Sequence, residues 1–474
     1  MGRAQMRFLS HDEEDMMHGQ SVRCLDELGV LIRSTQVLKM LENAGARVDF
    51  DRLIAHIPED MVSQAIKKAP SEFTLCARDP KHDMKVPVDG VPYAGTTGLA
   101  NYMTDLETGE RRNASKSDLG DFARLADAID AVDFFFMAVI PMDVPDRSHT
   151  VHQLWTSLQH TGKHVQQVEV MNAEDANIQI DLAALIAGGR DELRKRPLFS
   201  VICSPVSPLS FEKGAAEAQV ELSRAGIPIV SMTMPLSGLT APVTVAGTMN
   251  VVNAENLASL VISQTAEEGA PFVYSSAGTP ANMRSGSVPS GPAELPSITA
   301  GLGQLARRYG LPYMGGGWGL CNDAKPGVTM ALSEILSYGS ELFSAVDLTC
   351  GFGSLDGAKG AALEQVVIDA FTWKNFRPSL RKMEVDEQSI AFDVLRDVGQ
   401  GGTFLAHPHT LRNFRESIYD RDCHILKWEA TLSSDMVPDA RTVARQLISE
   451  HRVAGLEKTV LEKGDSIIRS YEKG

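Results

Sequence analysis

The chain has 474 residues, enough for one large α/β domain with extensions or for two or three ordinary domains. Its formal net charge is -16 and it has no basic run, which argues against nucleic acid as a partner, because phosphate neutralisation needs clustered Lys and Arg. No apolar stretch approaches the ~18 residues of a membrane span, and residues 1–10 lack the apolar core of a signal peptide. The six cysteines form no C-x-x-C pair, so we expect reduced thiols in a cytoplasmic protein.

The first 90 residues predict a small extension of helices and short strands. Residues 9–28 carry apolar side chains on one face and form the first expected helix. Residues 35–43 and 58–68 follow helix-start signals and predict two more. Residues 73–105 indicate irregular strands, with a hairpin around residues 107–109.

From residue 92 onward, short apolar runs alternate with helical patterns. Eight runs end in Gly, Pro or other small residues: 92–95, 134–141, 164–170, 198–205, 228–235, 271–278, 312–319 and 345–353. The helical patterns cover 117–129, 150–160, 173–187, 211–224, 243–267, 295–309, 328–343 and 360–371. Continuous apolar strands separated by helices indicate a parallel sheet buried on both faces. Eight such units predict a (β/α)8 barrel of the TIM type, and a doubly wound open sheet is the alternative.

The expected organisation is therefore an N-terminal extension at residues 1–90, a barrel at 91–375 and a C-terminal helical extension at 376–474. The C-terminal part includes a predicted long, charged helix at residues 443–470. The segment His407-Pro408-His409-Thr410 is interpreted as a turn that leads into a short helix at 411–417. We expect both extensions to pack on the barrel.

In a barrel of this type, active-site residues sit at the carboxyl ends of the strands. This rule singles out Tyr93, Pro141, Glu169, Ser204, Thr233, Ser275, Gly315 to Trp318, Asn322, Asp323, Cys350 and Phe352.

The densest of these segments is Gly315-Gly316-Gly317-Trp318-Gly319. Consecutive glycines let a strand end approach a bulky group or adopt positive φ, and Trp318 adds a large π face. The pattern favours a cofactor or cation site. The alternative is a tight turn with a packing tryptophan.

Metal ligation is not favoured by the residues. Cys203, Cys321 and Cys350 fall near expected strand ends, but their spacing has no zinc signature, and a buried cysteine is commonly a small hydrophobe. His149 and His152 share a helical face without an HExxH motif, and we interpret them as solvated or capping residues. We therefore predict no metal site.

The segment Cys321-Asn322-Asp323-Ala324-Lys325-Pro326, after the glycine-rich strand, resembles the heart of the trimethylamine methyltransferase family. In the founding branch of that family, this segment carries pyrrolysine at the place that Ala324 occupies here. Further segments resemble the family at residues 105–112 with the helix that follows, 239–244, 253–255 and 409–414. Together these segments span most of the chain.

The resemblance implies a (β/α)8 barrel that passes a methyl group from an amine to the cobalamin of a separate corrinoid protein. Members without pyrrolysine are similar to glycine betaine, proline betaine and carnitine demethylases. Because Ala324 replaces pyrrolysine, we expect a quaternary amine as substrate, with glycine betaine favoured and trimethylamine disfavoured. The cobalamin is expected on the partner rather than bound permanently, and the chain is expected to form a homo-oligomer.

The same reading assigns provisional roles to the site residues. Asn322 and Asp323 are expected to be catalytic, and Gly315, Gly316 and Gly317 to lie against the cofactor. A methylammonium is recognised by aromatic faces, and a substrate carboxylate by a cation such as Lys325 or Arg284. The expected substrate-binding residues are Tyr93, Trp318, Phe352, Ser275 and Lys325.

Two other functions remain open at the level of the sequence. A barrel lyase or aldolase would use Lys325 as a Schiff-base amine. A non-catalytic protein would bind the quaternary amine without transferring its methyl group.

Overall fold

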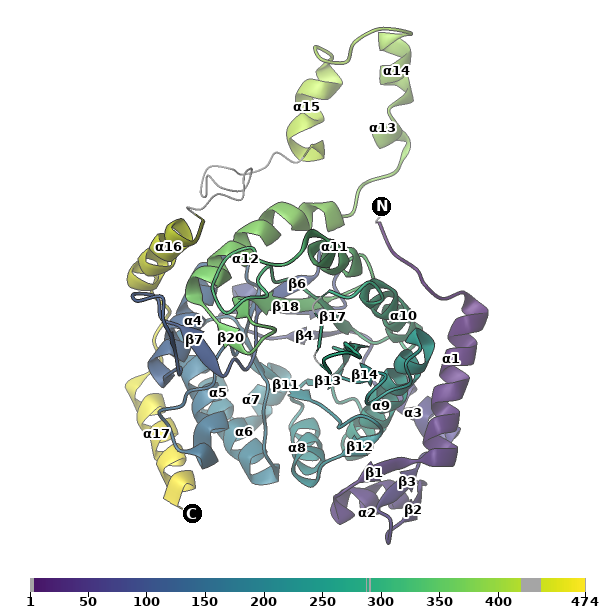
Figure 1. The fold of residues 1–474 in the computed structure, drawn as a ribbon, viewed down its shortest axis with the longest axis vertical. Coiled ribbons are helices and arrows are strands. Elements are labelled where there is room, and N and C mark those ends of the chain that lie inside the picture. The colour runs from purple at the N-terminus through teal and green to yellow at the C-terminus, as the bar shows by residue number, and fades with distance from the viewer. Residues whose placement is uncertain (1–3, 287, 290, 419–435, 474) are drawn as a thin grey trace.

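The computed structural model describes residues 4–286, 288–289, 291–418 and 436–473. Eight strands form a closed parallel barrel in the order β10-β11-β13-β15-β17-β18-β6-β9 (Figure 1). Their bounds are β6 Tyr93–Thr96, β9 Phe134–Phe136, β10 His164–Gln167, β11 Phe199–Cys203, β13 Ile229–Thr233, β15 Phe272–Ser276, β17 Tyr313–Gly317 and β18 Leu348–Phe352. Each strand coincides with one of the eight apolar runs, although β6 extends one residue beyond its run, so the predicted barrel is confirmed and the open sheet is excluded.

Helices surround the barrel and follow its strands in turn. They are α4 Lys116–Ala128, α5 His149–His160, α6 Ala173–Ala187, α7 Arg190–Lys195, α8 Lys213–Arg224, α9 Val245–Ala266, α10 Leu295–Arg308, α11 Leu332–Glu341 and α12 Leu363–Phe376. Local signals set several boundaries: Ser115 and Asp118 form a capping box on α4, and Gly188 ends α6 in the left-handed conformation. The predicted helix 328–343 is shorter in the structure, because residues 320–331 form a loop instead.

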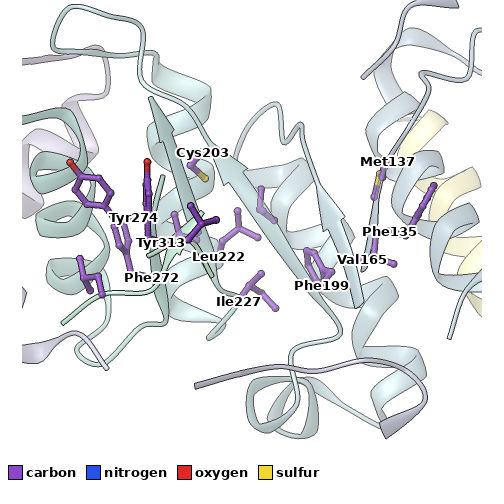
Figure 2. Packing of buried hydrophobic residues seen from close by; sticks show 14 of the residues in the cluster. Phe135, Met137, Val165, Phe199, Cys203, Leu222, Ile227, Phe272, Tyr274 and Tyr313 are labelled. Atoms are coloured by element: carbon purple, nitrogen blue, oxygen red, sulfur yellow. The ribbon is translucent and has the colours of Figure 1, made fainter. Parts of the chain in front are cut away.

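The strands bury side chains on both faces. Outward-facing residues such as Phe199, Phe272 and Tyr313 pack beneath the helices, as Figure 2 shows. Inward-facing residues form a separate group, the lumen cluster: Leu75, Met84, Val86, Phe134, Phe136, Ile202, Val230, Val273, Met314 and Leu348. This two-sided burial explains why the sequence shows continuous apolar runs rather than alternation.

One end of the barrel is closed by a hairpin. Strands β4 (Phe73–Leu75) and β5 (Met84–Val86) pair antiparallel and place Leu75, Met84 and Val86 in the lumen cluster. Beside them, His164 at the start of β10 contacts the carbonyl oxygen of Cys76 at 2.7 Å. Because these contacts involve the first residues of the strands, the hairpin covers the amino-terminal end, which we call the closed end. The opposite end is the mouth.

The N-terminal elements pack on one flank of the barrel (Figure 1). They are α1 His11–Arg23, continued by the π-helical turn η1 Cys24–Leu28, then β1 Val30–Ile32, α2 Thr35–Asn43, β2 Arg47–Asp49, β3 Ile54–His56 and α3 Glu59–Lys68. Helices α1 and α3 contact α9. Strands β1, β2 and β3 form a small sheet with β12 Ser210–Phe211.

Short strands and turns lie between barrel elements. β7 Tyr102–Thr104 and β8 Arg111–Arg112 form the predicted hairpin, which joins β19 Ser354–Leu355 and β20 Gly360–Ala361 in one sheet. β14 Leu236–Ser237 pairs with β16 Thr279–Pro280. The 3-10 turns are η2 Pro80–His82, η3 Asp146–Ser148 and η4 Arg377–Leu380.

After the barrel, the chain forms α13 Glu387–Ile390, α14 Phe392–Val398, α15 Pro408–Ser417, α16 Met436–Glu450 and α17 Lys458–Lys473. The prediction of one long helix at 443–470 was wrong, because residues 451–457 are not helical. The break lets the two helices pack on different parts of the barrel: α16 contacts α12 and α4, whereas α17 contacts α6 and α5. Cys423 and the rest of 419–435 lie outside the described residues. None of the described helices is both long enough and apolar enough to cross a membrane.

Helix α16 lies over the place where the barrel closes on itself. The first and last barrel strands, β6 and β18, pair there; α12 packs on β18, and α4 packs on β9, the other neighbour of β6. Arg441 of α16 donates to Glu364 of α12, whose side chain is completely buried, over 2.9 Å. Helix α16 thus holds α4 and α12, the first and last helices of the barrel, together.

Candidate functional site

The upper lumen, near the mouth, has a mixed lining. Met232 and Ser275 are register partners on β13 and β15, and Val168 and Cys350 approach from β10 and β18. Phe136 is the last residue of β9. Its ring occupies the space into which a side chain on Gly98, just beyond the end of β6, would project. Of the aromatic rings in the lumen cluster, it is therefore the one nearest the mouth. The hydroxyl of Ser275 is buried and has no hydrogen-bond partner among the described residues. An unpaired buried donor of this kind is available to a ligand.

The loop from residue 320 to 331 sits at the mouth and is anchored by two side chains of α12. Asp369 accepts hydrogen bonds from the backbone N–H groups of Leu320 at 3.2 Å and Gly353 at 2.9 Å. Gln365 accepts from the N–H of Gly327 at 2.8 Å and donates to Asp369 at 2.9 Å. Burial raises the pKa of Asp369 to about 7. The start of the loop and Gly327, within it, are therefore held by the same buried pair.

The middle of the loop is organised around Thr329 and Cys321. The Thr329 hydroxyl accepts from the N–H groups of Asn322 at 2.8 Å and Asp323 at 3.1 Å. The Cys321 thiol donates to the carbonyl oxygen of Lys325 at 3.1 Å. These bonds fold the loop so that Asp323, Ala324 and Lys325 are exposed at its tip.

Asn322 and Asp323, the predicted catalytic residues, lie in this ordered loop. The side-chain amide of Asn322 is 3.5 Å from a carboxylate oxygen of Glu334, and the carbonyl of Asp323 accepts from the N–H of Asp356 at 3.0 Å. Lys325 is exposed at the loop tip rather than enclosed in the lumen, which gives no support to a desolvated Schiff-base lysine. Arg284 is likewise exposed, in the loop after β16.

The three glycines at the end of β17 have distinct local causes. A Cβ on Gly315 would lie 2.4 Å from the Tyr313 ring, and Gly316 has a φ of +71° where the register with β18 shifts. The N–H of Gly317 donates to the buried carboxyl of Glu341 at 2.9 Å, which also accepts from Thr299 at 2.8 Å. Burial raises the pKa of Glu341 to about 8. The positive-φ reading is therefore confirmed at Gly316, and contact of these glycines with a cofactor stays a prediction.

Trp318 and Phe352 lie outside the lumen. The Trp318 indole donates to the carbonyl of Asp369 at 3.1 Å, and its ring stacks on Phe376 at a centroid distance of 4.6 Å. Phe352 is fully buried against Trp373 in the layer beneath α12. Neither ring is open to a ligand, so the structure does not support the aromatic cage expected from them. The bulge at Gly316 and the left-handed Gly351 interrupt strand alternation here and turn these rings outward.

Tyr93 lies at the other end of the barrel from the predicted site. It is the first residue of β6, its N–H donates to the carbonyl of Asp347 at 2.9 Å, and it packs on the lumen cluster beside the closing hairpin. The expectation that Tyr93 lines the mouth was wrong, because Tyr93 is the first residue of a strand that continues to Thr96. Ser275, by contrast, lies on the lumen side near the mouth.

A histidine and carboxylate pair lies at the mouth beside β9 and β10. His149, the first residue of α5, contacts Glu169 at 3.1 Å, and the hydrogen bond with Glu169 raises the pKa of His149. Glu169 follows β10 and keeps part of its side chain exposed. The strand-end rule had marked Glu169, but its histidine partner was interpreted only as a solvated or capping residue.

The three cysteines near the mouth do not converge. Cys203 packs in the outer layer (Figure 2), Cys350 lies against the lumen cluster, and Cys321 is held inside its loop. Among the residues that the structure describes, no group of three His, Cys, Asp or Glu side chains is placed to hold a metal ion.

Exposed apolar side chains ring the mouth. They lie on loops that follow the strands and on the start of α11, and four are methionines. We call this set the rim: Met142, Met171, Val206, Met234, Leu239, Val243, Met283, Val288, Leu332 and Leu336. Exposed apolar sets of this kind mark interaction surfaces, and methionine adapts to varied partners.

Sequence reasoning missed Phe136, Met232 and Gln166 in the lumen. Gln166 follows His164 by two residues and donates to the sulfur of Met314 at 3.3 Å across the barrel. Because alternate residues of a strand point to opposite faces, assigning every second residue of each strand to the lumen would have identified all three. In β9, the three consecutive phenylalanines hide that alternation.

Comparison with known proteins agrees with this architecture. The family described as "Trimethylamine methyltransferase (MTTB)" matches residues 2–470. Trimethylamine methyltransferase MttB of Desulfitobacterium hafniense (strain DSM 10664 / DCB-2) is 30% identical over 470 residues, which cover 98% of this chain and 93% of that protein. The glycine betaine methyltransferase of Desulfitobacterium hafniense (strain Y51) is 27% identical over 420 residues, covering 87% and 85% respectively.

A solved structure shares the fold at low sequence identity. The Methanosarcina barkeri monomethylamine methyltransferase (MtmB) aligns with a TM-score of 0.52 and 12% identity over 94% of this chain and 96% of that chain. Because the family match spans almost the whole sequence and one relative reaches 30% identity, the chain belongs to the trimethylamine methyltransferase family.

Proposed function

We propose that this methyltransferase demethylates a quaternary amine that carries a carboxylate, with glycine betaine favoured, and passes the methyl group to a corrinoid carried by a separate protein. The observation that carries the proposal is Ala324 at the exposed tip of the anchored mouth loop. The founding branch has pyrrolysine in the resembling segment. A relative at 27% identity is named a glycine betaine methyltransferase, which supports the same substrate class.

The chemistry of a quaternary amine suits a site without pyrrolysine. Its nitrogen departs as a neutral amine once the methyl group is attacked, so no proton donor is needed. The corrinoid, when bound at the mouth, supplies the nucleophile. The chain has to hold the methyl group toward the mouth and exclude water, which are tasks of orientation and enclosure.

The lumen offers contacts suited to a methylammonium. Phe136 presents an aromatic ring and Met232 a polarisable thioether near the mouth. A cation against an aromatic face gains about 0.5–2 kcal/mol. The Glu169 carboxylate at the end of β10 adds negative charge at the same end of the barrel, so the positive head of a betaine fits this side.

The carboxylate of the substrate needs donors, and Ser275 is the first candidate. Its hydroxyl is buried near the mouth without a partner among the described residues, so it can donate to a carboxylate without breaking an existing bond. Lys325 on the loop tip and Arg284 after β16 are exposed cations on the mouth side and are proposed as further carboxylate partners.

The rim fits the docking of a corrinoid-carrying protein. A corrin ring is too large for the lumen, so it has to meet the barrel at its mouth, where the apolar side chains of the rim are exposed. The glycine-rich end of β17 lacks side chains that would block a close approach, and contact between these glycines and the corrin is part of the proposal.

A substrate panel tests the proposal. The protein is mixed with cob(I)alamin, with and without a corrinoid protein encoded nearby, and the corrinoid absorbance is followed for glycine betaine, proline betaine, carnitine and trimethylamine. We expect a betaine to react fastest and trimethylamine slowly. The isostere 3,3-dimethylbutanoate, which keeps the carboxylate but has an uncharged tert-butyl head, should compete poorly. Equal rates with trimethylamine would overturn the substrate assignment, and betaine binding without any turnover would indicate a binding protein.

A further inference from the structure

Residues 381–418 form an arm that projects from the barrel (Figure 1). The arm has an outgoing branch with α13 and α14 and a returning branch with α15. None of its residues is buried. At the base, Arg381 donates to the carbonyl oxygen of Ser417 at 3.1 Å, and Lys382 pairs with Asp89, which precedes β6. The arm therefore leaves the barrel from the closed end.

The arm cannot keep its structure by local interactions alone. Its helices have 4, 7 and 10 residues, and isolated helices shorter than about 12–15 residues are marginal in water. In the described part of the chain, no hydrogen bond or ion pair joins α14 to α15. Ordering the arm costs conformational entropy that only burial against another surface can offset.

The arm also carries the apolar surface that such burial needs. Its exposed large apolar side chains are Met383, Val385, Ile390, Phe392, Leu395, Phe404, Leu405, Leu411, Phe414 and Ile418. Both branches contribute to this set. Exposed apolar surface of this extent marks a protein interface rather than a solvated loop.

The charges of the two branches are complementary. Residues 384–397 contain five acidic residues and one arginine, with Asp393 and Asp397 on α14. The returning helix α15 has the opposite balance, with Arg412 and Arg415 against the single acid Glu416. One arm thus carries both halves of an electrostatic match.

We propose that the arm pairs with the arm of a second copy of this chain, with α15 of each copy against the acidic branch of the other. A two-fold interface uses the same patch on both partners, so a patch with one acidic and one basic branch is complementary to itself. A second copy fits better than a different protein, because both halves of the match lie on one chain. Departure from the closed end leaves the mouth free.

Charge reversal tests the pairing. Sedimentation velocity over a concentration series should show a dimer or a larger even oligomer for the unmodified chain. The basic-branch variant Arg412→Glu/Arg415→Glu and the acidic-branch variant Asp393→Arg/Asp397→Arg should each weaken association by at least about tenfold, because like charges then face each other. A mixture of the two variants should form hetero-oligomers. The chain with all four changes should associate as the unmodified chain does.

An apolar control separates folding from association. Phe392→Asp/Leu395→Asp should give a monomer with an unchanged far-UV spectrum from the barrel, whereas Met16→Asp on α1, also exposed, should leave association unchanged. A monomeric unmodified chain, an oligomer insensitive to every arm variant, or charge-reversed chains that fail to complement each other would overturn the proposal. An arm that binds only the corrinoid protein would overturn it too. Because the readout is association alone, it is independent of the substrate assignment.

Discussion

The two ends of the barrel differ in how their lumen is filled. At the closed end, the β4–β5 hairpin fills the lumen with Leu75 and Val86, and His164 has partners on both ring nitrogens. At the mouth, the Ser275 hydroxyl has no partner among the described residues and the rim is exposed. The contrast separates two tasks in one fold: the closed end supplies stability, and the mouth keeps groups free for function.

The largest effect should come from a charge placed at the closed end. Val86→Asp buries an unpaired carboxylate in the lumen cluster and should cost roughly 5 kcal/mol, comparable to the whole stability of many domains. Met234→Asp on the rim should change stability by less than about 0.5 kcal/mol while slowing methyl transfer to the corrinoid protein. Urea unfolding and the corrinoid absorbance assay measure the two effects. A stable, active Val86→Asp protein would contradict the assignment of stability to the closed end and of function to the mouth.

Two buried aspartates that each accept backbone N–H groups give a matched test. Asp347, before β18, accepts from the N–H groups of Val88 at 2.9 Å and Tyr313 at 2.7 Å and pairs with Arg307. Asp347→Asn should cost about 2–3 kcal/mol, since Arg307 is partly exposed, and leave kcat unchanged in the folded fraction. Asp369→Asn should cost about 1–3 kcal/mol and also lower kcat, because the mouth loop loses an anchor. Equal effects of both variants on kcat would contradict this reading.

Two buried groups, one at each end of the barrel, should change the stability with pH in opposite directions. Burial lowers the pKa of His164 to about 4, so the unfolded chain binds more protons and stability falls as the pH drops from 6.5 toward 4. Burial raises the pKa of Glu341 to about 8, so the folded chain keeps a proton and stability falls as the pH rises from 4.5 toward 8. Each slope is at most about 1.4 kcal/mol per pH unit.

Single variants separate the two limbs of that pH profile. His164→Asn should reduce the slope of the acid limb only, and Glu341→Gln the slope of the alkaline limb only, in urea unfolding between pH 4 and 9. If either variant changed both limbs, the titrations could not be assigned to separate ends of the barrel.

The smallest effect is expected from two serines. Ser275→Ala removes an unpaired hydroxyl, so stability should change by less than about 1 kcal/mol, whereas the KM for a betaine should rise by at least about tenfold, the value of one hydrogen bond to a charged group. Ser200→Ala at the closed end removes the partner of His164 and should lower stability without changing KM. An unchanged KM in Ser275→Ala would remove this serine from the proposed site.

The sequence was sufficient for the barrel because its signal is repeated. Each strand is buried on both faces, so each appears as an apolar run, and an error at one run does not alter the count of eight. The face of the strand on which a given side chain lies is harder to predict than the existence of the strand. A one-residue change of register moves a side chain to the other face, and the bulge at Gly316 produces such a change before Trp318.

The anchors of the site could not be predicted locally. Asp369 accepts a hydrogen bond from the N–H of Leu320, which is 49 residues earlier in the chain, and no sequence pattern in either segment indicates this contact. Tyr93 was misplaced for a different reason, since an apolar run shows that a strand exists but does not show which of its residues comes first at the mouth. The pairing of Glu169 with His149 likewise joins two consecutive loops of the barrel.

The position of α16 has a consequence for synthesis of the chain. Helix α16 Met436–Glu450, which holds α4 and α12 beside the seam between β6 and β18, follows all eight strands in the chain, so a ribosome has to complete the strands and α12 before this helix can pack on the barrel. Until Arg441 emerges, the completely buried Glu364 lacks the guanidinium that it pairs with here. A nascent chain that ends before this helix should therefore still be bound by chaperones and cleaved by proteases, even after all eight strands have been synthesised.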